Sequence, residues 1–167
     1  MAIRTLTVNT VTPSAFGDGS ALTDNNYVGA IQGGSSTQRV NLTEIYMGGQ
    51  STASAVLRMV LARDSTVAGT LVLGTGQHDA ADDPATAALA APTVVGNSAT
   101  TDPQRSSTLH LRNWTFNAFG GIVRWFPADG RGPSIVGNTA SLGEISLSAF
   151  TSSEAGVLGA SMSYETL

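Results

Sequence analysis

The amino-acid sequence predicts an all-β protein: a β-sandwich, with a jelly roll as one form of it, of about nine or ten short strands and one short helix. Short runs alternate between apolar and polar residues at period two, and Gly, Pro, Asn and Asp punctuate them. The densest stretch, Gly120–Phe150, holds three such runs around the turn-rich loop Pro127–Pro133. With 167 residues, 41% of them hydrophobic, we expect a single domain over residues 1–167.

The first two strands are predicted at residues 4–12 and 27–32. In the first, Leu6 and Val8 share one face and polar residues share the other, which is typical of a half-buried strand. Pro13 ends this run, and loop residues fill the interval up to Tyr27. The chain is therefore expected to enter a sheet almost at its first residue.

A stronger strand is predicted at residues 38–47. Strict alternation divides its residues between two faces: Val40, Leu42, Glu44 and Tyr46 on one, and Asn41, Thr43, Ile45 and Met47 on the other. The glycine-rich segment Gly48–Ser51 predicts a turn, and the next apolar run, 55–63, is then the second strand of a hairpin. A helix over 53–62 is the alternative, but β-branched residues and the preceding glycines favour a strand.

The rest of the chain continues the same pattern. Asp83 as N-cap, Pro84 at the first helical position and an alanine-rich body predict the one helix over 83–90, which ends before Pro92. Polar loops are expected at 74–83 and 96–107. The remaining strands are predicted at 70–73, 93–95, 108–119, 122–126, 135–136, 142–150 and 157–164.

Composition excludes several classes of function. Charged residues make up 12% of the chain, about half the usual fraction of roughly 25%. The net charge is −4, and the positive charge consists of scattered Arg residues without any Lys, so we predict no nucleic-acid partner. The chain has no Cys, which removes disulfides, thiolate nucleophiles and Cys-ligated zinc. Neither a signal peptide nor an apolar run long enough to span a bilayer is present, so we expect a soluble protein without a membrane partner.

No residue pattern predicts catalysis, a metal site or a cofactor. His78 and Asp79, with the aspartates before the predicted helix, lack the spacing of a calcium loop and fit a solvated loop. His110 has no second histidine at ligand spacing, and no Gly-x-Ser-x-Gly motif occurs. Glu44 and Glu144 are the pair that a glycosidase would need, although exposure at an edge or interface is the favoured interpretation. We therefore predict that the protein is not an enzyme.

The two tryptophans allow two interpretations. Trp114 and Trp125 both lie in predicted strands among apolar neighbours, which favours a place in the core or at a subunit interface. An exposed ring beside polar side chains would instead suit a carbohydrate platform.

Four segments of the sequence, 41–50, 59–67, 116–125 and 135–150, resemble small proteins encoded among the virion structural genes of tailed bacteriophages. The resemblance extends over most of the chain. It implies a capsid decoration, or cement, protein: a β-sandwich or jelly-roll module that stabilises the phage head by bridging major capsid proteins, commonly as a trimer. The implied location is the capsid surface of the virion, after synthesis in the host cytoplasm. A carbohydrate- or receptor-binding module of a phage tail or fibre is the alternative.

For a decoration protein the side chains of interest are those at partner interfaces, which are enriched in Arg and aromatic residues. We predict Arg4, Arg124, Trp125 and Arg131 as partner contacts, with the major capsid protein and further copies of this chain as the partners. A strand that begins near Met1 could also be lent to a neighbour by β-augmentation.

Overall fold

The protein is all-β in the residues that its structure, a computed structural model, describes: 3–9, 27–33, 37, 39–66, 77–80, 93–95, 104–129, 132–137, 143–149 and 158–166. Eleven strands lie in these ranges. They are β1 (Ile3–Asn9), β2 (Tyr27–Gln32), β3 (Arg39–Gln50), β4 (Val56–Thr66), β5 (Gln77–Ala80), β6 (Thr93–Val95), β7 (Gln104–Asn117), β8 (Phe119–Trp125), β9 (Ser134–Val136), β10 (Glu144–Ala149) and β11 (Leu158–Thr166).

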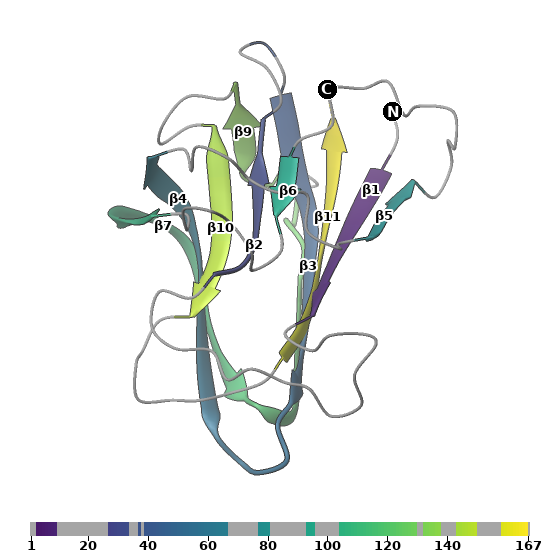
Figure 1. The fold of residues 1–167 in the computed structure, drawn as a ribbon, viewed down its shortest axis with the longest axis vertical. Helices are drawn as coiled ribbons and strands as arrows, with labels where there is room; N and C mark the ends of the chain where they lie inside the picture. Colours follow the sequence, from purple (N-terminus) through teal and green to yellow (C-terminus); the bar gives the residue numbers. More distant parts are fainter. Residues whose placement is uncertain are drawn as a thin grey trace.

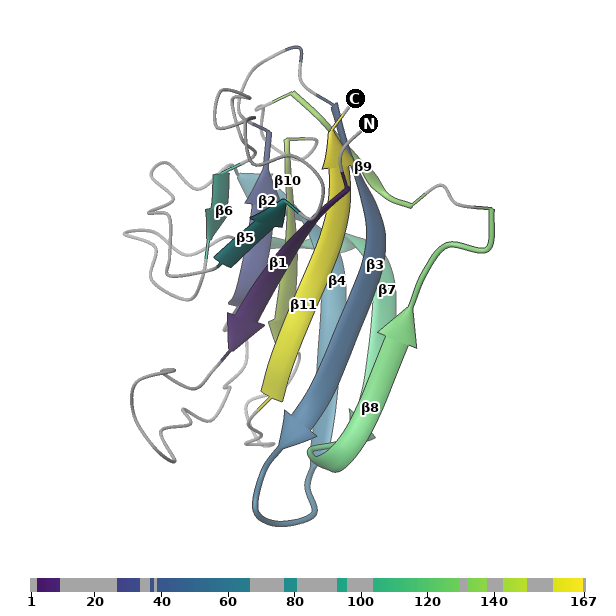
Figure 2. The same ribbon diagram turned by 90° about the vertical axis from the view of Figure 1, so that its right-hand side faces the viewer.

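The strands form two antiparallel sheets that face each other. The first sheet has the order β5-β1-β11-β3-β8, with β9 on the end of β3, and the second has the order β6-β2-β10-β4-β7. Figure 1 shows β4, β10 and β2 on one side of the molecule and β3, β11 and β1 on the other. Figure 2 shows the first sheet face on, with β8 at its edge.

The pairing order is that of a jelly roll. Four nested antiparallel pairs, β4–β7, β3–β8, β2–β10 and β1–β11, make one long hairpin ribbon. The ribbon wraps so that β11 also pairs with β3 in one sheet and β10 with β4 in the other. Two antiparallel sheets with strands connected in this order form a jelly roll. The predicted β-sandwich, and its jelly-roll form, are confirmed.

The core lies between the two sheets. Inward side chains of β3 and β11, such as Ile45 and Met162, meet those of β4 and β10, such as Leu61 and Leu147, and each of these four is at most 1% exposed. Tyr164 of β11 is the largest fully buried side chain among the described residues. Close packing of such residues makes each missing methylene costly.

Two chain crossings between the sheets meet at one end of the sandwich. Residues 51–55 carry the chain from β3 to β4, and Ala118 joins β7 to β8. Ser51 N–H donates to the Ala118 carbonyl over 2.9 Å, and Ala118 N–H donates to the Ala55 carbonyl over 2.8 Å. The predicted β3–β4 hairpin is therefore wrong: the two strands lie in different sheets, and Gly48–Gln50 continues β3 instead of turning.

Other strand predictions have mixed outcomes. The run 55–63 is a strand and not a helix, and the runs at 27–32 and 93–95 match β2 and β6. The loop predicted at 74–83 contains β5, and the loop at 96–107 contains the start of β7, because sheet pairing recruits polar segments that have little intrinsic strand preference. The predicted strand 70–73 and the helix 83–90 lie outside the described residues.

A bulge in β3 changes which side chains face the core. Ser163 of β11 is opposite Glu44, but the next residue, Tyr164, is opposite Leu42, so Thr43 is the extra residue. A one-residue shift moves all following side chains to the other face. The strict alternation predicted for residues 38–47 is therefore wrong. The core side carries Val40, Leu42, Ile45 and Met47, while Glu44 and Tyr46 point outward.

Candidate functional site

Exposed apolar side chains gather on β8 and the neighbouring part of β3. We call this the β8 surface and define it by Tyr46, Gly48, Phe119, Ile122, Arg124 and Phe126. Ile122 is 65% exposed, Phe126 62% and Phe119 59%. Ile122 and Arg124 point outward because Val123 and Trp125 alternate with them and pack against the core. Large apolar side chains that are exposed together on a sheet are typical of an interaction surface.

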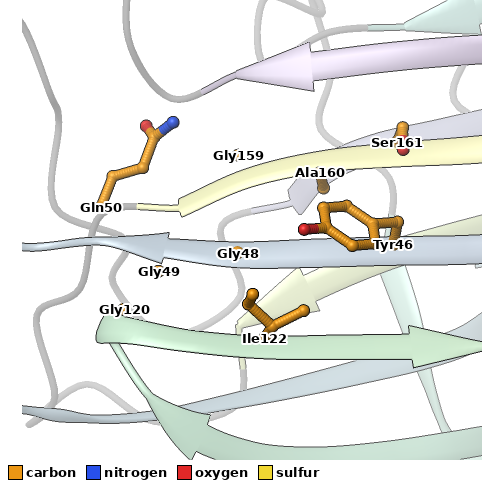
Figure 3. A pocket seen from close by; sticks show the side chains of 9 residues that line it. All are labelled: Tyr46, Gly48, Gly49, Gln50, Gly120, Ile122, Gly159, Ala160 and Ser161. Atoms are coloured by element: carbon orange, nitrogen blue, oxygen red, sulfur yellow. The ribbon is translucent and has the colours of Figure 1, made fainter.

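The β8 surface contains an open hollow of about 440 Å³. Its floor is backbone, since Gly48 of β3 lies opposite Gly159 of β11 on one side and opposite Ile122 of β8 on the other. Figure 3 shows the Tyr46 ring and the Ile122 side chain at the sides of the hollow, with Gln50 at its end. Such a floor allows a partner's flat or apolar group to approach the backbone closely.

The charges at the β8 surface cancel one another. Arg124 Nε lies 2.6 Å from Glu44 Oε1, on the neighbouring strand β3. The Arg124 side chain is 65% exposed, so this ion pair contributes little to the free energy of folding. The main consequence of the ion pair is that the β8 surface carries no net charge at this location.

Trp125 lies on the opposite face of β8 and closes the gap between the edges of the two sheets. Its ring meets that of Trp114, from β7, edge to face with centroids 6.2 Å apart. The Arg112 guanidinium carbon lies 5.5 Å from the centroid of the Trp125 ring. Both tryptophans are half-buried against the core cluster. This arrangement uses the ring faces and edges for internal packing.

The structure places the four predicted contact residues in different locations. Arg124 and Trp125 are neighbours on β8 but point to opposite faces. Arg4 lies on β1, and β11 and β3 separate that strand from β8, which is roughly 14 Å of sheet at about 4.8 Å per strand. Arg131 lies outside the described residues. Arg124 and Trp125 are therefore adjacent on β8, although they face opposite sides of the sheet, and Arg4 lies away from both.

The two carboxylates considered for a glycosidase lie in different sheets. Glu44 is on β3 in the first sheet, and Glu144 begins β10 in the second. Glu144 has instead a buried acidic neighbour that sequence reasoning missed, Asp64 of β4. No sequence signal links these two residues, because only the β4–β10 pairing brings them together.

Asp64 is a fully buried carboxyl group. Ser146 Oγ donates a hydrogen bond to Asp64 Oδ1 over 2.5 Å, while Asp64 Oδ2 is buried without a hydrogen-bond partner among the described residues. Burial raises the pKa of Asp64 from 3.8 to about 6, and hydrogen bonds from Ser146 and Glu144 oppose this rise. Because the side chain is closed off from solvent, we assign this cluster to the packing of the second sheet.

Within the described ranges, no three His, Cys, Asp or Glu side chains come close enough to hold a metal ion. The same ranges contain no helix that is long and apolar enough to cross a membrane. No protein-family model and no curated protein matches the sequence of this chain.

Proposed function

We propose that this chain is a structural virion protein of a tailed bacteriophage, which decorates the capsid and stabilises the head by bridging major capsid proteins. The observation that carries the proposal is the β8 surface: a row of exposed apolar side chains beside a glycine-floored hollow, held on a jelly-roll sheet. Jelly rolls are a recurrent architecture of viral capsid proteins, so the fold is consistent with this role. The resemblance of four sequence segments to phage virion proteins supports the same assignment.

The mechanism that we propose is additional buried interface. A rigid two-layer module that contacts two capsid subunits adds a contact that must break before the shell can expand or rupture. Aliphatic side chains such as Ile122 suit this task, since covering them costs less rotamer entropy than covering Lys, Arg or Glu side chains. Arg124 and Trp125 remain the predicted contacts of β8, and Arg4 and Arg131 remain predictions for contacts elsewhere.

The arrangement of the tryptophans favours decoration over the alternative, a glycan-binding module. A carbohydrate platform needs a free aromatic face beside polar side chains. Trp114 and Trp125 are instead packed edge to face, and Arg112 lies over the Trp125 ring. A broad glycan panel, screened with the purified protein, tests the alternative directly.

The decoration proposal is tested by co-sedimentation. Empty capsids of the same virus, assembled from its major capsid protein without this chain, are mixed with the purified protein and pelleted. We expect saturable binding and a higher temperature of capsid disruption. If the protein stays in the supernatant at micromolar concentration and leaves capsid stability unchanged, the proposal fails.

A further inference from the structure

We propose that β8 is the contact strand between two copies of this chain, which pair edge to edge in antiparallel orientation. The contact goes beyond capsid decoration and does not depend on it. It would extend the first sheet continuously from one copy into the other. Isologous contacts of this kind place the same surface of both copies around a twofold axis.

Three of the four outermost strands in the two described sheet orders carry features that discourage pairing, and β9, which pairs with the end of β3 off this order, has only three residues. β5 has four residues and β6 has three, and short edge strands offer few backbone groups to a neighbour. β7 is long, but its pairing with β4 shifts register three times, and its exposed side chains include Arg112, Asn113 and Thr115. Bulges and polar side chains are the usual protection of an edge strand.

β8 has less of this protection: its pairing with β3 shifts register once, between Gly48 and Gln50, and Arg124 is its one charged residue. Its seven residues include no Pro or Lys, and its outward row contains the exposed Ile122 and continues to Phe126. One row of its backbone groups pairs with β3, while the other row faces away from the sheet. A largely apolar edge strand with little protection is a template for pairing with another chain.

The charge distribution allows a second copy at this edge. Each copy carries a net charge of −4, so two copies repel each other over most of their surfaces. At β8 the Arg124–Glu44 pair cancels the local charge, and the remaining residues of the β8 surface are uncharged. A contact at this location brings no unpaired like charges together.

Whole-strand pairing produces favourable cross-strand neighbours. Centred on Ile122, the middle residue of β8, it places the two Ile122 side chains opposite each other and Arg124 opposite Gly120 of the second copy. Aliphatic and aromatic cross-strand pairs stabilise a sheet by about 0.2–1 kcal/mol each.

Mass measurement by light scattering tests the contact. From about 5 to about 500 µM, a range in which a micromolar Kd populates both states, we expect the full chain to pass from monomer to dimer. Ile122→Lys should weaken association at least about tenfold. Leu109→Lys changes an exposed residue of β7 and should leave association unchanged. Far-ultraviolet circular dichroism checks that both variants are folded.

Crosslinking gives a second measurement. Because the chain has no Cys, Ile122→Cys introduces a single thiol, which should form an intermolecular disulfide under mild oxidation. Val136→Cys, at an exposed position on β9, should stay unlinked. A wild-type monomer at all concentrations, a trimeric mass, or equal crosslinking of the two variants overturns the proposal.

The capsid assay separates this contact from the proposed function. A wild-type protein that is monomeric at all concentrations but binds capsids overturns the β8 contact and leaves decoration standing. A wild-type dimer that is dissociated by Ile122→Lys but ignores capsids supports the contact and removes decoration.

Discussion

Ser146 and Asp64 form a buried hydrogen bond across the β10–β4 pair, with the Ser146 hydroxyl donating to Asp64 Oδ1 over 2.5 Å. Both side chains are at most 1% exposed, and Glu144 is buried beside them. A buried carboxyl group is far less costly when it carries a proton than when it is ionised. The ionised form of the Asp64 carboxyl group in the second sheet therefore opposes folding.

The free energy of unfolding should fall as the pH rises through this group's titration. The pKa of Asp64 is about 6 in the folded protein and about 3.8 when the side chain is solvated. Asp64 holds its proton more tightly in the folded than in the unfolded protein. The stability that this protonation contributes is therefore complete below about pH 4, and it is lost as the pH approaches and passes 6. The loss at neutral pH is on the order of 3 kcal/mol. Chemical denaturation at several pH values measures it.

Asp64→Asn is the matched variant, because the amide is neutral and still accepts a hydrogen bond from Ser146. We expect it to be more stable than the wild type at pH 7 and to lose that advantage near pH 4. The difference between the two proteins reports on the Asp64 site, including its hydrogen bond with Glu144, and not on the remaining carboxyl groups. If this difference does not vary between pH 4 and pH 7, Asp64 does not titrate as described.

Strand positions could be predicted from the sequence, but strand partners could not. Period-two alternation locates β1 and β11, because a half-buried strand needs that pattern. Nothing local distinguishes a turn at Gly48–Ser51 from a strand that continues to Gln50 and crosses to the other sheet. That choice depends on Ala118, 67 residues further along the chain, whose carbonyl accepts from Ser51 and approaches Gly49.

The candidate site was predictable to a similar extent. An Arg beside a Trp in an apolar run indicates β8 as a contact strand, and the structure shows that Arg124 points outward and Trp125 inward. The hollow could not be predicted, since the Thr43 bulge determines that Tyr46 points outward. The Asp64–Glu144 pair could not be predicted either, because 79 residues of sequence separate two side chains that only sheet pairing joins.

Two adjacent glycines of β3 should respond oppositely to alanine. A Cβ on Gly49 would lie 2.2 Å from the Ala118 carbonyl oxygen. That carbonyl would have to shift, which would disturb the chain crossing. A Cβ on Gly48 would meet nothing within 4 Å. We expect Gly49→Ala to destabilise the fold by roughly 2 kcal/mol or more. Gly48→Ala should be neutral or stabilising by about 0.5 kcal/mol. Urea denaturation of both variants provides the measurement, and equal losses would contradict the geometry.

The Glu44–Arg124 ion pair should contribute little to stability. Both side chains retain solvent access, at 31% and 65% exposed, and solvent screens their attraction. A double-mutant cycle with Glu44→Ala and Arg124→Ala should give a coupling energy below about 1 kcal/mol, and added salt should reduce it. A coupling of several kcal/mol would mean that the pair is buried in solution, as a partner on the β8 surface would cause. The cycle is therefore measured at a protein concentration low enough to keep the chain monomeric.

Trp125 and Phe126 are adjacent aromatic residues with opposite roles, and truncation should separate them. Trp125 packs against the core and against Trp114, so Trp125→Ala should cost about 3 kcal/mol in the free energy of unfolding. Phe126 is 62% exposed, so Phe126→Ala should change that free energy by less than about 0.5 kcal/mol. Trp114 is the only tryptophan left in Trp125→Ala. Its fluorescence should shift to longer wavelength, because removal of the Trp125 ring exposes it to water. Denaturation monitored by circular dichroism gives both free energies. A larger loss for Phe126→Ala than for Trp125→Ala would mean that these two side chains have their faces exchanged, and the assignment of the β8 surface would be wrong.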